Sequence, residues 1–415
     1  MKGILFTATA LLVSSFLFAQ QDNTLLPGGQ WRGILSRSDG KEIVINFEVK
    51  DSFQKKRMFI TNAAERLAVD DITFKGDSVI IILPFFDSQF RLISNNRNQL
   101  AGEWIKRLAD RNVVIPFTAT HNENYRYKVS ATATPVNITG RWAATFSDSA
   151  GTKSSSNVGV FEQNGNKLTG SFLTVSGDYR YLEGVVDGDS LKLSGFDGGY
   201  ALLFTAKIND DKTISGGRFY SGAGPGWQVW SAEKNNNAAL PETTSLLKSG
   251  VSPKVAFTFK DVNGKPVSFS DKQFKNKVVI LQVSGTWCPN CMDETRFLNE
   301  VYEKYKSKGV EIIALLYERT EDFSRSQAAA KNFIKRLNVG YPVLITPVAV
   351  GDPQRVEKTL PQLERIPAFP TAIFVDRKGE IQKIHIGFSG PGTGEAEYSR
   401  QKEEYIHIIE MLLSK

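Results

Sequence analysis

The sequence predicts a multidomain protein, with a β-rich N-terminal region of two related antiparallel β units followed by a C-terminal α/β domain. Short strand-like runs separated by turn signals fill the chain up to residue 234. From Val255 onward the pattern changes to strands that alternate with amphipathic helices. The length of 415 residues suits two or three domains.

The charge balance argues against a nucleic-acid partner. The formal net charge is +7, but the basic residues are dispersed, and the densest cluster is only Lys55-Lys56-Arg57. Binding to nucleic acid needs a basic stripe or patch. We therefore predict a soluble, generally basic surface and no nucleic-acid partner.

The N-terminus has the pattern of a signal peptide over residues 1–19. A positive start at Lys2 precedes an apolar stretch over 4–18, and Ala19 offers a small residue for cleavage. The stretch is short for a membrane span, although a retained N-terminal anchor is the alternative. No later stretch suits a span, so we expect an exported or periplasmic protein that is not integral to the membrane.

Residues 20–234 are expected to form only β structure, with clear strands at 43–49, 78–83 and 200–204. Landmarks recur at nearly one spacing: Gly-x-Trp at 29–31 and 140–142, and Gly-Asp-Ser at 76–78 and 188–190. We predict β units over 20–128 and 129–234, then a linker over 235–252. The Gly-x-Trp starts resemble lipocalin-like barrels, and a barrel or a sandwich fits. The many aromatic residues are expected to fill the β core.

The C-terminal domain, residues 253–415, shows a different order of elements. Strands are expected at 257–259, 278–283, 310–316, 371–375 and 381–386, and helices at 289–307, 324–337 and 397–413. Asp352-Pro353 gives a third, inserted helix its start signal. This order is that of the thioredoxin fold with a leading strand and a helical insertion.

Cys288 and Cys291, the only cysteines of the chain, are the strongest functional signal. They follow a buried strand and open a helix, which is the arrangement of a redox dithiol. The N–H groups and dipole of the helix N-terminus stabilise a thiolate, so Cys288 is expected to attack. Cys291, one turn further in, is expected to resolve the mixed disulfide.

Two other interpretations of this pair are weaker. A zinc site needs two more ligands, and His121, His385 and His407 are not paired at metal spacing. A structural disulfide that closes so short a loop would stabilise the fold little. We therefore predict redox chemistry without a metal or a cofactor.

Residues 253–415 resemble the exported TlpA/ResA-like disulfide reductases of the thioredoxin and AhpC/TSA superfamily. Three marks carry the resemblance: Trp287-Cys288-Pro289-Asn290-Cys291, Glu294, and Phe369-Pro370-Thr371 at the start of a strand. The resemblance implies that Trp287 shields the dithiol and offers a docking face. It also implies that Pro370 is a cis-proline, so that Phe369, Pro370 and Thr371 contact substrate. Pro367 is a nearby competitor for the cis position.

The resemblance gives Glu294 the role of handling the proton of the resolving cysteine. A solvated helix carboxylate is the alternative. The chain departs from cytoplasmic thioredoxin in having Gln282 where a buried acid stands, six residues before the first cysteine. The Pro289-Asn290 dipeptide is also unusual, which leaves the direction of electron flow open. The loop 387–394 is expected near the dithiol, either as a partner-admitting loop or as a plain connection.

These observations predict a periplasmic thiol-disulfide oxidoreductase that reduces disulfide-bearing protein substrates. The resemblance implies that a membrane thiol donor re-reduces it. One alternative is a thiol peroxidase, although Gly285 stands where those enzymes carry a threonine. Another is a β-domain binding module with the redox domain as a tethered effector.

Overall fold

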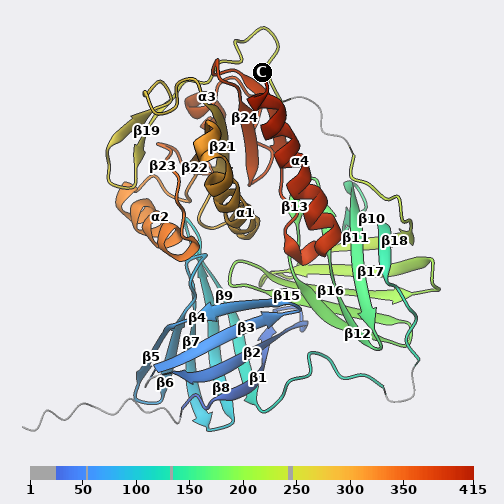
Figure 1. The fold of residues 1–415 in the computed structure, drawn as a ribbon. Coiled ribbons are helices and arrows are strands. Elements are labelled where there is room, and N and C mark those ends of the chain that lie inside the picture. Colours follow the sequence, from blue (N-terminus) through green and yellow to red (C-terminus); the bar gives the residue numbers. More distant parts are fainter. Residues whose placement is uncertain (1–24, 53–54, 131–133, 242–245) are drawn as a thin grey trace, which may run out of the picture.

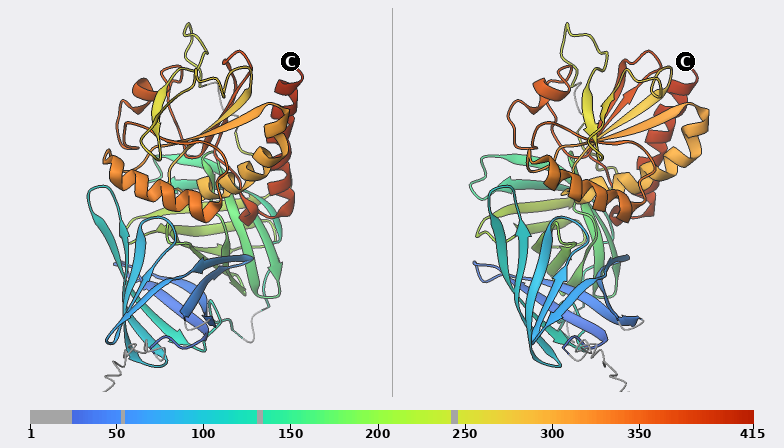
Figure 2. Two further views of the ribbon diagram at one scale, coloured as in Figure 1. Left: turned by 60° about the vertical axis from the view of Figure 1, so that its left-hand side comes forward. Right: turned by 90° about the vertical axis from the view of Figure 1, so that its left-hand side faces the viewer.

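A computed structural model describes residues 25–52, 55–130, 134–241 and 246–415, so the predicted signal peptide lies outside the described residues. Two β units and one α/β domain make up the structure (Figures 1 and 2). The α/β domain lies over both β units, and the same arrangement is seen in all three views.

The first β unit is a nine-stranded antiparallel sheet in the order β4-β3-β2-β1-β9-β8-β7-β6-β5. Its strands are β1 Gly29–Ser36, β2 Glu42–Ser52, β3 Lys55–Asn62, β4 Glu65–Val69, β5 Asp71–Lys75, β6 Ser78–Ile82, β7 Ser88–Asn96, β8 Gln99–Arg107 and β9 Asn112–His121. Pairing of β1 with β9 joins the first and last strands in the middle of the sheet.

The second β unit has the same central pairing, here between β10 and β18. Its strands are β10 Gly140–Asp148, β11 Ser154–Asn164, β12 Lys167–Thr174, β13 Gly177–Asp178, β14 Leu182–Asp187, β15 Ser190–Phe196, β16 Ala201–Ile208, β17 Thr213–Ser221 and β18 Trp227–Lys234. An additional pairing of β11 with β12 closes the sheet into a ring. Of the two predicted architectures, the barrel is therefore the one observed in this unit.

The two Gly-x-Trp motifs occupy equivalent places in the two units. Trp31 and Trp142 are both fully buried. Each indole donates to the carbonyl four residues earlier, Trp31 Nε1 to Pro27 O at 3.1 Å and Trp142 Nε1 to Ile138 O at 2.8 Å. A buried indole needs such an acceptor. The two motifs thus make the same local contact in both units.

The aromatic residues of the β units mainly fill their interiors. In the second unit they form a continuous ring cluster around Phe146, Phe172, Phe204, Phe219 and Trp230. Trp227 is an exception, with 42% of its surface exposed. The core assignment of these aromatics is thus largely confirmed.

The α/β domain has a seven-stranded sheet in the order β20-β19-β23-β22-β21-β24-β25, in which β21, β22 and β23 are parallel. Its strands are β19 Thr258–Asp261, β20 Pro266–Ser268, β21 Val278–Ser284, β22 Val310–Leu316, β23 Val343–Ile345, β24 Thr371–Val375 and β25 Ile381–Ile386. Its helices are α1 Pro289–Tyr305, α2 Phe323–Leu337, α3 Arg355–Thr359 and α4 Glu395–Leu413, with 3₁₀ turns at Lys306–Lys308 and Pro391–Thr393. This is the predicted thioredoxin-like fold.

Two details of this domain differ from the sequence-based expectation. Strands β20 and β23 were not predicted, because runs of three residues are too short to show a period. Helix α3 begins at Arg355 rather than at Asp352-Pro353. The Asp352 carboxylate accepts the Gln354 N–H at 2.8 Å, which forms a turn before the helix.

The last part of the segment predicted as a linker, from residue 246 onward, is attached to the α/β domain. Leu246 is buried, and its carbonyl accepts the Glu364 N–H at 2.8 Å. The Lys248 N–H donates to Gln362 O at 2.9 Å. Residues 246–248 thus follow the surface of the α/β domain.

A buried arginine joins all three parts of the molecule. Arg180, between β13 and β14, forms ion pairs with Glu65 of the first unit at 2.7 Å, Asp197 of the second at 2.7 Å and Asp293 of α1 at 2.8 Å. Its side chain is 3% exposed. Buried carboxylates are costly unless they are paired, and a guanidinium has enough donors to satisfy several of them.

We predict that Arg180→Met lowers the free energy of unfolding by about 3 to 5 kcal/mol, because it leaves buried carboxylates unpaired. Urea unfolding followed by tryptophan fluorescence measures this loss. Arg111→Met is the matched control, since its pair with Asp110 is exposed and should contribute less than about 1 kcal/mol. Equal losses in the two variants would contradict the role given to Arg180.

Candidate functional site

The two cysteines lie at the start of α1, where the sequence predicts them. Cys288 is the N-cap residue, and its Sγ accepts the Cys291 N–H at 3.1 Å. The two form a disulfide, with Cys288 3% exposed and Cys291 fully buried. Pro289 occupies the first turn, where its missing N–H costs nothing. After reduction, the same N–H and the helix dipole favour a thiolate at Cys288.

Three of the predicted substrate-contacting residues surround Cys288. The Phe369–Pro370 peptide bond is cis, as expected, and Phe369 O lies 3.4 Å from Cys288 Sγ. The ring of Trp287 meets that of Phe369 edge-on at 5.3 Å, and its Nε1 donates to Tyr317 O at 2.8 Å. The carbonyl of Phe369 is therefore positioned beside the dithiol.

Thr371 is placed differently from these three residues. It is fully buried in β24, and its hydroxyl donates to Ala368 O at 2.9 Å. Its side chain therefore supports the turn that holds Pro370, and any substrate contact at this position must come from backbone atoms.

Glu294 is fully buried, so the alternative of a solvated carboxylate is wrong. Its Oε1 accepts from Tyr405 Oη at 2.7 Å, and its Oε2 accepts from Gln282 Nε2 at 2.9 Å. Burial raises the pKa of Glu294 to about 7, although these two hydrogen bonds oppose the shift. Gln282, which stands where thioredoxin has a buried acid, thus fixes the carboxylate of Glu294 by a hydrogen bond.

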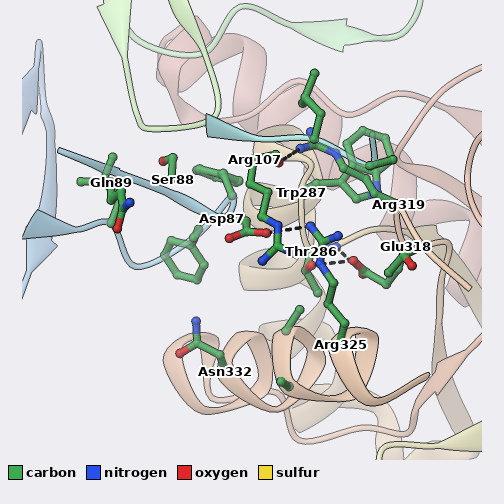
Figure 3. A pocket seen from close by; sticks show the side chains of 18 of the residues that line it. Asp87, Ser88, Gln89, Arg107, Thr286, Trp287, Glu318, Arg319, Arg325 and Asn332 are labelled. Atoms are coloured by element: carbon green, nitrogen blue, oxygen red, sulfur yellow. Dashed lines mark hydrogen bonds and ion pairs between the residues drawn. The ribbon is translucent and has the colours of Figure 1, made fainter. Parts of the chain in front are cut away.

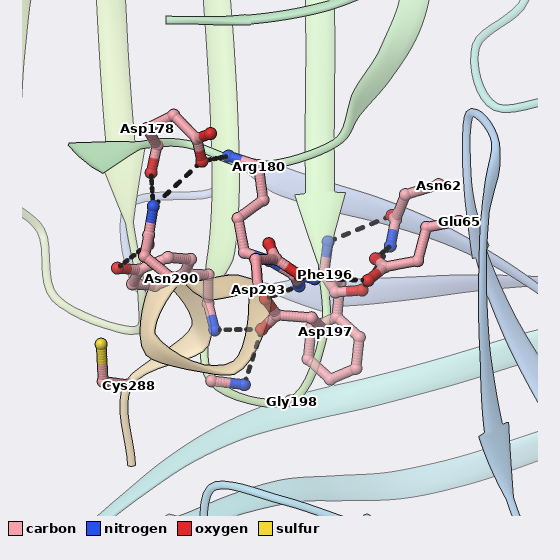
Figure 4. A network of polar contacts seen from close by, with 12 residues as sticks. Asn62, Glu65, Asp178, Arg180, Phe196, Asp197, Gly198, Cys288, Asn290 and Asp293 are labelled. Carbon is pink, nitrogen blue, oxygen red and sulfur yellow. Dashed lines mark hydrogen bonds and ion pairs between the residues drawn. The ribbon is translucent and has the colours of Figure 1, made fainter. Parts of the chain in front are cut away.

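The second β unit contacts the dithiol motif directly. Asn290 is 3% exposed, and its Nδ2 donates to the carbonyl and to the carboxylate of Asp178, both at 3.0 Å (Figure 4). Tyr200 Oη donates to Asn290 Oδ1 at 3.2 Å. A Cβ on Gly199 would lie 2.7 Å from Pro289 Cγ, so glycine permits this close approach. The Pro-Asn dipeptide is therefore covered by β-unit residues.

The loop 387–394 completes this contact. The Gly390 N–H donates to Asp178 Oδ2 at 2.7 Å, and Phe388 O lies 3.5 Å from Asn290 Nδ2. Burial, together with the charge of Asp293, raises the pKa of Asp178 to about 7. The loop thus binds the second β unit, and it is not the plain connection that the sequence also allowed.

Sequence reasoning missed Asp178, Arg180 and Tyr200. Asp178 and Asn290 are 112 residues apart and belong to different units. An Asp-Tyr-Arg-Tyr run at a β turn carries no motif that indicates a contact with a distant helix.

Within the described part of the chain, no group of three or more His, Cys, Asp or Glu residues could hold a metal ion. None of its helices combines the length and apolarity needed to cross a membrane.

Comparison with known proteins agrees with this geometry. Residues 237–401 match the family model Redoxin, so the match includes part of the segment predicted as a linker. Over 154 residues the chain is 36% identical to thiol-disulfide oxidoreductase ResA of Bacillus thuringiensis subsp. konkukian, covering 37% of this chain and 74% of that protein. The chain is 28% identical to ResA of Bacillus subtilis over 151 residues, which cover 36% of this chain and 74% of that protein.

Solved structures match over a similar share of the chain. A putative thiol:disulfide interchange protein DsbE from Chlorobium tepidum is 22% identical, with a TM-score of 0.29, over 39% of this chain and 99% of that one. A putative protein disulfide isomerase from Bacteroides thetaiotaomicron is 22% identical, with a TM-score of 0.29, over 40% of this chain and 95% of that one.

The dithiol at a helix N-terminus in a thioredoxin-like domain, together with these relatives, defines a thiol-disulfide oxidoreductase. More specifically, the chain belongs to the ResA-like family of these enzymes.

The raised pKa of Glu294 predicts a pH-dependent contribution to stability. The folded protein holds a proton on Glu294 up to about pH 7, whereas the unfolded chain releases it near 4.5. The resulting contribution to the free energy of unfolding is fully present below pH 4.5 and is lost as the pH rises through 7. The loss is up to about 1.4 kcal/mol per pH unit. We predict that Glu294→Gln removes this slope, as measured by urea unfolding between pH 5 and 7.5.

Glu303→Gln, on the exposed side of the same helix, is the control and should unfold with the pH dependence of the unsubstituted protein. If the difference between Glu294→Gln and the unsubstituted protein stays constant across this pH range, Glu294 does not titrate with a raised pKa.

Proposed function

We propose that the protein is an exported enzyme that reduces disulfides of other proteins by dithiol exchange. The observation that carries the proposal is the position of Cys288 Sγ, capped by the Cys291 N–H and 3.4 Å from Phe369 O. An extended segment of a substrate can pair with backbone atoms at Phe369 and bring its disulfide to Cys288. Trp287, packed against Phe369, supplies an apolar face for the same segment.

The exchange proceeds in two balanced steps. The Cys288 thiolate attacks one sulfur of the substrate disulfide, which forms a mixed disulfide and releases one substrate thiolate. The Cys291 thiolate then attacks Cys288 Sγ, which forms the Cys288–Cys291 disulfide and releases the second substrate thiolate. Two electrons pass from the enzyme dithiol to the substrate, whose thiolates take up protons from water.

Glu294 is the residue that we assign to the proton of Cys291. It lies three residues further along α1, on the same face of the helix. With a pKa of about 7, its carboxylate can accept a proton near neutral pH. The hydrogen bonds from Gln282 and Tyr405 hold the carboxylate in place while it does so.

The proposed location and electron source follow from the N-terminal pattern and from the family resemblance. Removal of residues 1–19 would leave Gln20 as the first residue of the exported protein. A thiol donor in the membrane would then reduce the Cys288–Cys291 disulfide after each turnover. N-terminal sequencing of protein from the envelope or medium tests the export, and an uncut N-terminus contradicts it.

We predict that Cys291→Ser accumulates a mixed disulfide with disulfide-bearing test proteins such as insulin, because no second thiol releases the substrate. Cys288→Ser should form none and should lack insulin reductase activity. Non-reducing electrophoresis and mass spectrometry identify the linked cysteine. A trapped adduct through Cys291 in the Cys288→Ser variant would reverse the assigned roles.

A further inference from the structure

A cleft opens between the first β unit and the α/β domain, next to the dithiol. Its volume is about 940 Å³, near the upper end for pockets that hold a small ligand. One wall comes from the β6–β7 connection and from the β8–β9 hairpin, and the other from α2 and residues 286–287 and 318–320 (Figure 3). The cleft is therefore large enough for several residues of a peptide.

Trp287 connects this cleft to the reacting sulfur. It lines the cleft, precedes Cys288 in the chain, and packs against Phe369, whose carbonyl is 3.4 Å from Cys288 Sγ. The other side of the motif is closed, because Asn290 is covered by Asp178 and its neighbours in the second β unit. A chain that pairs at Phe369 has room to continue into the cleft past Trp287.

The cations of the cleft are all arginines. They come from both walls and are Arg91, Arg107, Arg111, Arg319 and Arg325. The guanidinium of Arg319 lies 5.4 Å from the centre of the Trp287 ring, and its Nη1 donates to Arg107 O at 3.1 Å. Arginine is the side chain best suited to bidentate recognition of carboxylates.

The acids of the cleft are already occupied. Asp87 pairs with Arg325 at 2.9 Å, and Asp110 pairs with Arg111 at 3.2 Å. Glu318 accepts from the N–H and the hydroxyl of Thr286, both at 2.9 Å. Among the described residues, no ion pair engages the exposed Arg107 side chain. In the described part of the chain, the cleft therefore presents an arginine without an ion-pair partner, whereas the carboxylates that line it all have partners.

We propose that this cleft binds the disulfide-bearing segment of the protein substrate and selects extended segments with acidic side chains beside the cysteine. The inference rests on the proposed reductase function and adds the class of substrate. Arg107 acts in it as a specificity-determining residue, because it stands at the end of β8 on the cleft rim. Its backbone contacts, with Asp87 and Arg319, do not depend on its side chain.

The test uses the full chain and two peptides that each contain one intramolecular disulfide. The peptides are identical except for two glutamates or two lysines beside one cysteine. We expect kcat/KM to be roughly tenfold higher for the acidic peptide at low salt, with a smaller preference at high salt. Arg107→Glu should lower the ratio of acidic to basic kcat/KM at least about fivefold.

Arg97→Glu is the matched control. Arg97 lies in the turn between β7 and β8, at the opposite end of the same hairpin, roughly 30 Å from Arg107. Arg97→Glu makes the same change of charge as Arg107→Glu and should leave the ratio of acidic to basic kcat/KM unchanged. Equal rates for the two peptides, or equal effects of the two variants, would overturn the cleft assignment and leave the reductase function standing. If neither peptide nor insulin is reduced, the reductase function fails and the inference fails with it.

Discussion

The Arg180 ion cluster is the interaction on which the arrangement of this molecule depends. One buried guanidinium forms ion pairs with carboxylates from the first β unit, the second β unit and α1, as Figure 4 shows. In a low-dielectric interior these charges are tolerated only while they remain together. The position of the dithiol helix relative to both β units is therefore fixed by electrostatics as well as by apolar packing. Asp293, which takes part in the cluster, is only two residues from Cys291.

This constraint makes the β units part of the active-site surroundings. The second unit covers Pro289 and Asn290 through Gly199, Tyr200 and Asp178, whereas the first unit stands back and leaves a cleft beside Trp287. In the proposed function, the α/β domain supplies the chemistry and the β units restrict the direction from which a substrate can arrive. The redox domain is therefore packed against both β units rather than joined to them by the linker alone.

The parts that could be predicted from the sequence are those with local signals. Strand β22 and strand β24 were predicted to the residue from their apolar runs. The cis bond was implied by the family resemblance, and its place before β24 favoured Pro370 over Pro367. The contacts of Asn290 and the arginine cluster could not be predicted, because they join units far apart in the chain. The orientation of Thr371 was also missed, since a strand's first residue can face either side. Burial of Glu294 depends on Gln282 and Tyr405, which only the folded structure brings together.

We propose that this dithiol donates electrons to protein disulfides, and its reduction potential tests that direction of electron flow. Equilibration of the intact protein with thiol buffers, followed by mass-shift alkylation of Cys288 and Cys291, measures the potential. We predict a reduction potential at or below roughly −220 mV, in the range of glutaredoxins and thioredoxins. A value near about −120 mV, which is typical of the oxidant DsbA, would contradict it and reverse the direction of electron flow.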